Sequence, residues 1–142
     1  MSTTFRSRFI SPAQYRGLQK LGDGMCPGDD DFPSFSACGC GEHVDEILEL
    51  MNPGDLAQLK QLLTAAAVMP AAGVQQLLKA AERSPHMSDS NPLAPTLRFL
   101  RLGLRGLVLS LYYSGRTGVD HTGPSPLDVI GYEVSVYTAD LP

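Results

Sequence analysis

Residues 97–113 read LRFLRLGLRGLVLSLYY and form the longest apolar stretch of the chain, without a proline. Two sets of side chains recur in it at helical spacing. One is a polar stripe of Arg98, Arg101 and Arg105, and the other is an apolar stripe of Leu97, Leu100, Leu104, Leu107 and Leu111. The spacing predicts a helix that is amphipathic in its first half.

The second half of this helix, residues 106–113, has only Ser110 as a clearly polar residue. A helix that is apolar nearly all round must be buried on nearly all sides. The segment is therefore expected to be the central helix of a small bundle or a contact surface for another chain. A membrane span is not expected, because three arginines interrupt the segment and its uninterrupted apolar run is too short.

The overall composition indicates one domain and restricts the class of partner. A chain of 142 residues is expected to fold as a single helical domain, 1–142. The net charge of −4 argues against a nucleic-acid partner, which needs clustered positive charge. The N-terminus lacks an apolar signal segment, and Ser7 separates Arg6 from Arg8, so neither a secretory nor a twin-arginine signal is expected if Met1 is the true start. We expect a cytoplasmic protein.

The rest of the chain shows helix starts and two irregular segments. Ser11, Pro12 and Gln14 form a capping box that begins a helix ending near Met25. Residues 26–41 are expected to be a loop, and further helices are expected from about Glu42, after Asn52 and from Pro70. The fold class is therefore all-α, a small bundle of about five helices. Residues 115–142 form a long irregular tail that wraps the bundle or a partner, with one helical turn starting at Ser125 and Pro126.

The candidate metal-binding or redox residues are Cys26, Cys38, Cys40 and His43. Their types suit zinc, but the spacing differs from the usual C-x₂₋₄-C pairs. Buried or loop thiols, and a disulfide of Cys38 with Cys40 or with Cys26, remain alternatives. Asp120 and His121 are a possible acid–base pair but have no nucleophile at readable spacing. No phosphate-binding loop is present, so the sequence shows no autonomous active site.

The last third of the chain is rich in tyrosines and branched aliphatic residues. Tyrosine is enriched at protein interfaces because it combines a large contact area with one polar group. The sequence predicts a partner interface in this region, with the alternative that the tail covers its own helices. The predicted interface residues are Arg105, Leu107, Leu111, Tyr112, Tyr113, Val129, Ile130, Tyr132, Val134 and Tyr137.

Four segments, in order, resemble the gluconate 2-dehydrogenase subunit 3-like family. These are FISPAQYRGLQKLGDGMCPGDDDFPS at residues 9–34, HVDEILELM at 43–51, LRFLRLGLRGLVLSLYYSG at 97–115 and LDVIGYEV at 127–134. In the family, a glutamine-bearing first helix precedes an acidic, proline-containing segment. A long helix near the C-terminus ends in an aromatic pair, followed by a glycine and later a Gly-Tyr element.

The resemblance implies a non-catalytic small subunit of an FAD-dependent oxidoreductase of the glucose-methanol-choline type. The partner would be the large FAD-binding subunit, which oxidises sugars, polyols or related alcohols, and some complexes add a cytochrome subunit. No cofactor and no catalytic residue is expected in this chain. Many members carry a twin-arginine signal and escort the flavoprotein during export. Because this signal is missing here, the expected role is stabilisation of the catalytic subunit. The alternative is a small metal- or redox-binding helical protein that uses the three cysteines and His43.

Overall fold

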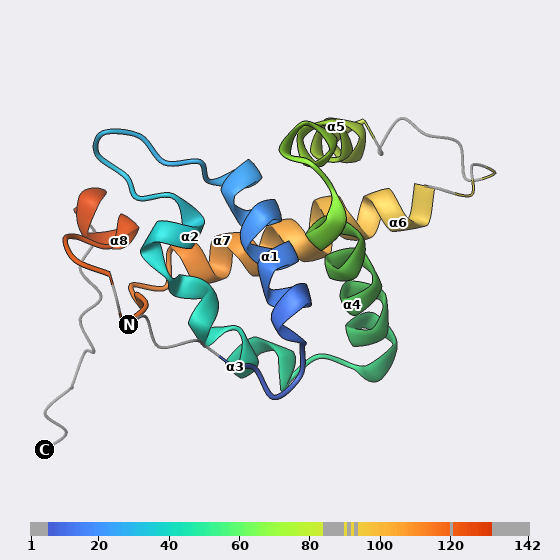
Figure 1. The fold of residues 1–142 in the computed structure, drawn as a ribbon, viewed down its shortest axis with the longest axis horizontal. Helices are drawn as coiled ribbons and strands as arrows, with labels where there is room; N and C mark the ends of the chain where they lie inside the picture. Colours follow the sequence, from blue (N-terminus) through green and yellow to red (C-terminus); the bar gives the residue numbers. More distant parts are fainter. Residues whose placement is uncertain (1–5, 84–89, 91, 93, 120, 132–142) are drawn as a thin grey trace, which may run out of the picture.

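The computed structural model describes residues 6–83, 90, 92, 94–119 and 121–131, and these residues form helices and no strand (Figure 1). The all-α prediction is confirmed. The elements are, in order, α1 Pro12–Met25, α2 Phe35–Cys38, η1 Cys40–His43, α3 Asp45–Leu48, α4 Pro53–Val68, α5 Ala71–Glu82, α6 Ala94–Arg98, η3 Phe99–Leu104, α7 Arg105–Tyr112 and α8 Pro126–Val129. Within the described residues, no helix has the length and apolarity that a membrane crossing requires.

The two longest α-helices, α1 and α4, begin where local capping chemistry predicts. At α1, the Gln14 backbone N–H donates to the Ser11 hydroxyl at 3.1 Å, and the Ser11 N–H donates to the Gln14 side chain at 2.9 Å. At α4, the Asp55 N–H donates to the Asn52 side chain at 2.8 Å. These bonds satisfy backbone donors that have no partner within the helix. The predicted ends of α1 and the predicted start of α4 are confirmed.

The segment predicted as a loop, residues 26–41, contains one helical turn, α2, and the start of the 3₁₀ helix η1. The hydroxyl of Ser34 accepts the Ala37 N–H at 3.2 Å and starts α2. Gly39 ends it with φ of 71°, a left-handed conformation that glycine adopts at little cost. The helix predicted from about Glu42 is likewise divided between η1 and the short α3. Turns of four residues are too short to produce a readable hydrophobic period.

The long helix predicted for residues 97–113 begins earlier, at Ala94, and is not α-helical throughout. Its middle part, η3, is a π-helix, and α6, η3 and α7 follow one another without a break. A π-helical segment holds more residues per turn than an α-helix, so the side chains on either side of it are rotated relative to one another. The predicted apolar stripe of Leu97, Leu100, Leu104, Leu107 and Leu111 is nevertheless buried along its whole length.

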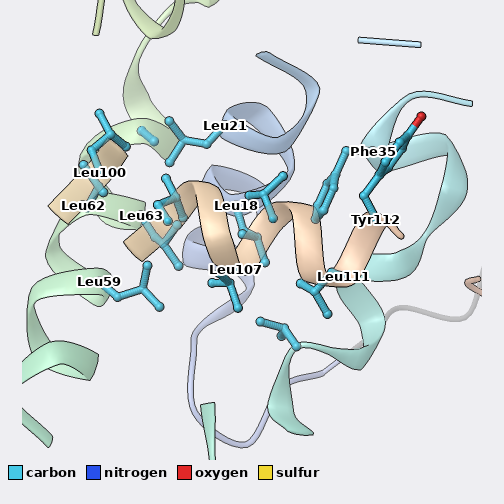
Figure 2. Close-up of a cluster of buried hydrophobic side chains, with 14 of the residues drawn as sticks. Leu18, Leu21, Phe35, Leu59, Leu62, Leu63, Leu100, Leu107, Leu111 and Tyr112 are labelled. Atoms are coloured by element: carbon cyan, nitrogen blue, oxygen red, sulfur yellow. The ribbon is translucent and has the colours of Figure 1, made fainter. Parts of the chain in front are cut away.

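The core lies where α1 packs between α4 and the long helix (Figure 1). Leu18 and Leu21 of α1 are fully buried, and Figure 2 shows them among leucines of α4 and α7. The most extensive pairing is that of α1 with α4. A Cβ atom placed on Gly17 would lie 2.1 Å from the carbonyl oxygen of Leu63, so the two backbones meet there without a side chain between them.

Candidate functional site

Three thiols gather at one end of the bundle, and all are free and buried. Cys26 follows α1, Cys38 ends α2 and Cys40 begins η1, so the turn at Gly39 places the last two side by side. The thiol and the backbone N–H of Cys40 both hydrogen-bond to the sulfur of Cys38. The sulfur of Cys40 also lies 4.0 Å from the carbonyl oxygen of Phe35.

The two neighbouring thiols differ in acidity. The hydrogen bond from the Cys40 thiol lowers the pKa of Cys38, and the nearby rings of His121 and His43 act in the same direction. The same bond, together with burial, raises the pKa of Cys40. However, neither residue has any exposed surface, and a thiol closed off from solvent does not react with dissolved substrates.

The histidines beside the thiols are bound to backbone carbonyls. Nε2 of His43 lies 3.1 Å from the carbonyl oxygen of Thr117. The ring of His121 lies 3.2 Å from the Ala37 carbonyl through Nδ1 and 3.1 Å from the Pro124 carbonyl through Nε2. Among the described residues, no three His, Cys, Asp or Glu side chains are grouped so as to hold a metal ion. The four candidate residues of the alternative hypothesis, Cys26, Cys38, Cys40 and His43, do not form such a group. Asp120 lies outside the described residues.

The first part of the C-terminal tail covers the thiol pair. The Gly118 N–H donates to the Cys38 carbonyl at 2.9 Å, and the Val119 N–H donates to the Glu42 carboxylate at 2.9 Å. Arg116 pairs with Glu46. These contacts hold the segment around Gly118 against α2 and η1, and Gly118 approaches Gly39 closely. The sequence contains no signal for this pairing, because the partners are at least 70 residues apart and share no motif.

Three residues of the predicted interface are buried within the chain itself. Leu107, Leu111 and Tyr112 are each at most 5% exposed and belong to the core (Figure 2). The hydroxyl of Tyr112 donates to the carbonyl oxygen of Pro33 at 2.6 Å. The chain's own helices and the loop before α2 therefore cover this side of α7. A partner in contact with the folded chain does not reach these three residues, which corrects their assignment to the interface.

Other predicted interface residues face outward. Arg105 is exposed, Tyr113 is 42% exposed, Ile130 is 53% exposed and Val129 is half-buried. Tyr132, Val134 and Tyr137 lie outside the described residues. Leu102 and Val119, which the sequence interpretation did not select, are 69% and 76% exposed. Leu102 was missed because it lies off the leucine stripe that faces the core.

Comparison of the chain with protein-family models, curated proteins and solved structures gives no match. Its function is therefore argued from its own residues and from the resemblance of its sequence segments.

Proposed function

We propose that this chain is a small, non-catalytic subunit that binds and stabilises the catalytic subunit of an FAD-dependent sugar or alcohol oxidoreductase. One observation carries the proposal: large apolar side chains stay exposed in the C-terminal third of the chain. Leu102, Tyr113, Val119 and Ile130 all lie between residues 102 and 130. Exposed apolar side chains are one indication of a contact surface. The resemblance to the family of small subunits supplies the identity of the partner.

The state of the chemically active side chains supports a non-catalytic role. The Cys38 and Cys40 thiols are closed off from solvent, and the His43 and His121 rings bond to backbone carbonyls. Each of these groups holds α2, η1 and the tail together. In this proposal FAD and the reacting alcohol bind to the large subunit, and this chain contributes contact area.

Purification from the native host tests the proposal. The chain, tagged and expressed at its natural level, is expected to elute with a larger protein that shows flavin absorbance and alcohol dehydrogenase activity. The larger protein expressed without the chain is expected to lose activity faster on warming. A stable chain that elutes alone, with no flavoprotein attached, would contradict the proposal.

A pair of matched variants locates the contact. Ile130→Glu places a charge in the proposed contact region and is expected to weaken the complex at least about tenfold, since a buried unpaired charge is costly. Val68→Glu is the control, because Val68 ends α4 and is 84% exposed but lies outside residues 102–130. Equal effects of the two variants would place the contact elsewhere.

A further inference from the structure

A groove follows the outer face of η3 and α7. It consists of three adjoining hollows of about 330, 340 and 240 Å³. The hollows of 330 and 340 Å³ share Arg101, Arg105 and Leu109, and the hollow of 240 Å³ adjoins both at Leu109. The three together are here called the α7 groove. The end of α1 and α5 line the hollow of 330 Å³, and the loop after α1 lines the hollow of 240 Å³.

The floor of the α7 groove is an apolar stripe along the helix. Leu102, Gly106, Leu109 and Tyr113 follow one another at intervals of four, three and four residues, the spacing of one helix face. Leu102 and Tyr113 are exposed and Leu109 is half-buried. A Cβ atom placed on Gly106 would have nothing within 4 Å. The distance between packed helices depends on the side chains at their contact, so a glycine here permits close approach of a second helix.

The edge of the α7 groove is positively charged. Arg101, Arg105 and Lys79 line it, together with two carboxylates, that of Glu82 and, in the 240 Å³ hollow, that of Asp29. Neither arginine forms an ion pair or a hydrogen bond with any residue that the structure describes. Two guanidinium groups without carboxylate partners, beside an apolar floor, are complementary to a segment that is both apolar and acidic.

We infer that the α7 groove is the docking site for an amphipathic, acidic helix of the flavin-binding catalytic subunit, whose carboxylates pair with Arg101 and Arg105. This inference rests on the proposed function and specifies the chemistry of the partner. A second copy of this chain fits the groove less well. A second copy could offer the region of α3, which is acidic and lies next to the exposed Leu50. The carboxylates of this region, however, already have partners within the chain. Asp45 bonds to Ser7 and Arg8, and Glu46 pairs with Arg116.

Charge reversal tests the ionic part of the inference. The Arg101→Glu/Arg105→Glu double variant is titrated against the flavoprotein that co-purifies with the wild-type chain, at about 0.1 M salt, where the Debye length is about 10 Å. We expect the dissociation constant to rise at least about thirtyfold, as for charge pairs removed from a buried contact. The Arg101→Lys/Arg105→Lys variant keeps the charge and should restore most of the binding. Arg6→Glu/Arg16→Glu changes the net charge equally, outside the groove, and should bind like the wild type.

Filling the floor tests the shape of the groove independently. Gly106→Gln adds a side chain where the free chain has open space, so the chain itself should fold normally, as checked by circular dichroism. Its length blocks a docked helix, and the dissociation constant is expected to rise at least about tenfold. Gly54→Gln is the matched control, since Gly54 is an exposed helical glycine of α4, outside the groove.

The outcomes separate this inference from the proposed function. Loss of binding in both groove variants, with normal binding in both controls, supports the inference. A complex that forms equally well with both groove variants overturns the inference and leaves the proposed function standing. If no flavoprotein binds the wild-type chain, both fail. A free chain that is dimeric by light scattering and becomes monomeric in the groove variants would assign the groove to a second copy and overturn the inference.

Discussion

Gly17 of α1 and Gly106 of α7 occupy helices of the same chain and have opposite surroundings. A Cβ atom on Gly17 would lie 2.1 Å from the Leu63 carbonyl oxygen and 3.2 Å from the Ala67 nitrogen, both in the backbone of α4. A Cβ atom on Gly106 would meet nothing within 4 Å. The first glycine belongs to a closed contact between two helices, and the second belongs to an open face.

The difference shows which side of the bundle is complete. Glycine inside a helix costs about 1 kcal/mol relative to alanine, because it gives up more backbone freedom. At Gly17 the close packing of α1 on α4 offsets this cost. At Gly106 no described part of the chain approaches closely enough to need a glycine. The inner side of α7 is therefore packed against the core, whereas its outer side at Gly106 is open.

The largest expected effect is at the closed contact. Gly17→Val would place two methyl groups against the backbone of α4, which cannot move aside as a flexible side chain can. We expect a loss of about 3 kcal/mol or more in the free energy of unfolding, at or beyond the usual range for overpacked cores. Urea denaturation followed by circular dichroism measures it. A loss below about 1 kcal/mol would mean that α1 and α4 separate easily and that their contact is not the closed side.

A second comparison uses two leucines of η3. Leu100 is fully buried and Leu102 is 69% exposed. Leu100→Ala removes core packing and is expected to cost about 3 kcal/mol, within the range for buried leucines. Leu102→Ala is expected to change the stability of the isolated chain by less than about 0.5 kcal/mol, as for most surface substitutions. A much larger loss for Leu100→Ala than for Leu102→Ala would show that η3 has one buried face and one exposed face. Equal losses would show that η3 does not have this orientation.

A third substitution tests the hydrogen bond that closes the inner side of α7. Tyr112→Phe removes the hydroxyl that donates to Pro33, leaving a carbonyl oxygen without this donor. The expected loss is about 1–2 kcal/mol, the usual effect of leaving a buried polar group without its hydrogen bond. Thermal unfolding at neutral pH measures it, with Tyr113→Phe as the control because the ring of Tyr113 is 42% exposed. A larger loss in the free energy of unfolding for Tyr113→Phe than for Tyr112→Phe would show that the hydroxyl of Tyr113, and not that of Tyr112, stabilises this side of α7.

Alkaline pH should weaken the same inner side. Burial, with smaller contributions from nearby acidic groups and thiols, raises the pKa of Tyr15 and that of Tyr112 from 10.0 to about 12. A raised pKa in the folded state means that folding favours the neutral phenol. The resulting stabilisation is complete below pH 10 and is lost as the pH rises from 10 to 12. Urea denaturation across this range should show a smaller loss for Tyr112→Phe than for the wild type, and an equal loss would exclude Tyr112 as a contributor.

The sequence predicts the helices that depend on local chemistry. Ser11, Gln14 and Asn52 bond to backbone groups within three residues, so the starts of α1 and α4 can be read from their neighbours. The single turn α8 is predicted from Ser125 and Pro126, and the structure adds a capping box between Ser125 and Asp128. These bonds do not depend on where the rest of the chain lies.

The candidate site depends on contacts between distant residues, and the sequence does not reveal them. The hydrophobic pattern shows that α7 is apolar nearly all round, but it does not show that its own chain covers Leu107, Leu111 and Tyr112 and leaves Leu102 exposed. The cover over the thiols similarly arises from the approach of Gly118 to Gly39, two residues without side chains.

The smallest expected effect is at the open face, and it has the opposite sign. Gly106→Ala should stabilise the isolated chain by about 0.5–1 kcal/mol, because the methyl group meets no neighbour and the unfolded chain loses conformational freedom. Thermal unfolding of the isolated chain measures it. Gly17→Ala is the matched control and is expected to destabilise, since its added Cβ clashes with the Leu63 carbonyl.

Gly106 makes the isolated chain less stable than alanine would, so its benefit is expected in the complex, where a docked helix needs close approach. If Gly106→Ala stabilises the isolated chain and weakens its complex with the flavoprotein, the two measurements together assign the glycine to the docked state. If Gly106→Ala destabilises the isolated chain, a neighbour approaches Gly106 in solution. In that case the outer face of α7 is already covered, and the contrast with Gly17 does not hold.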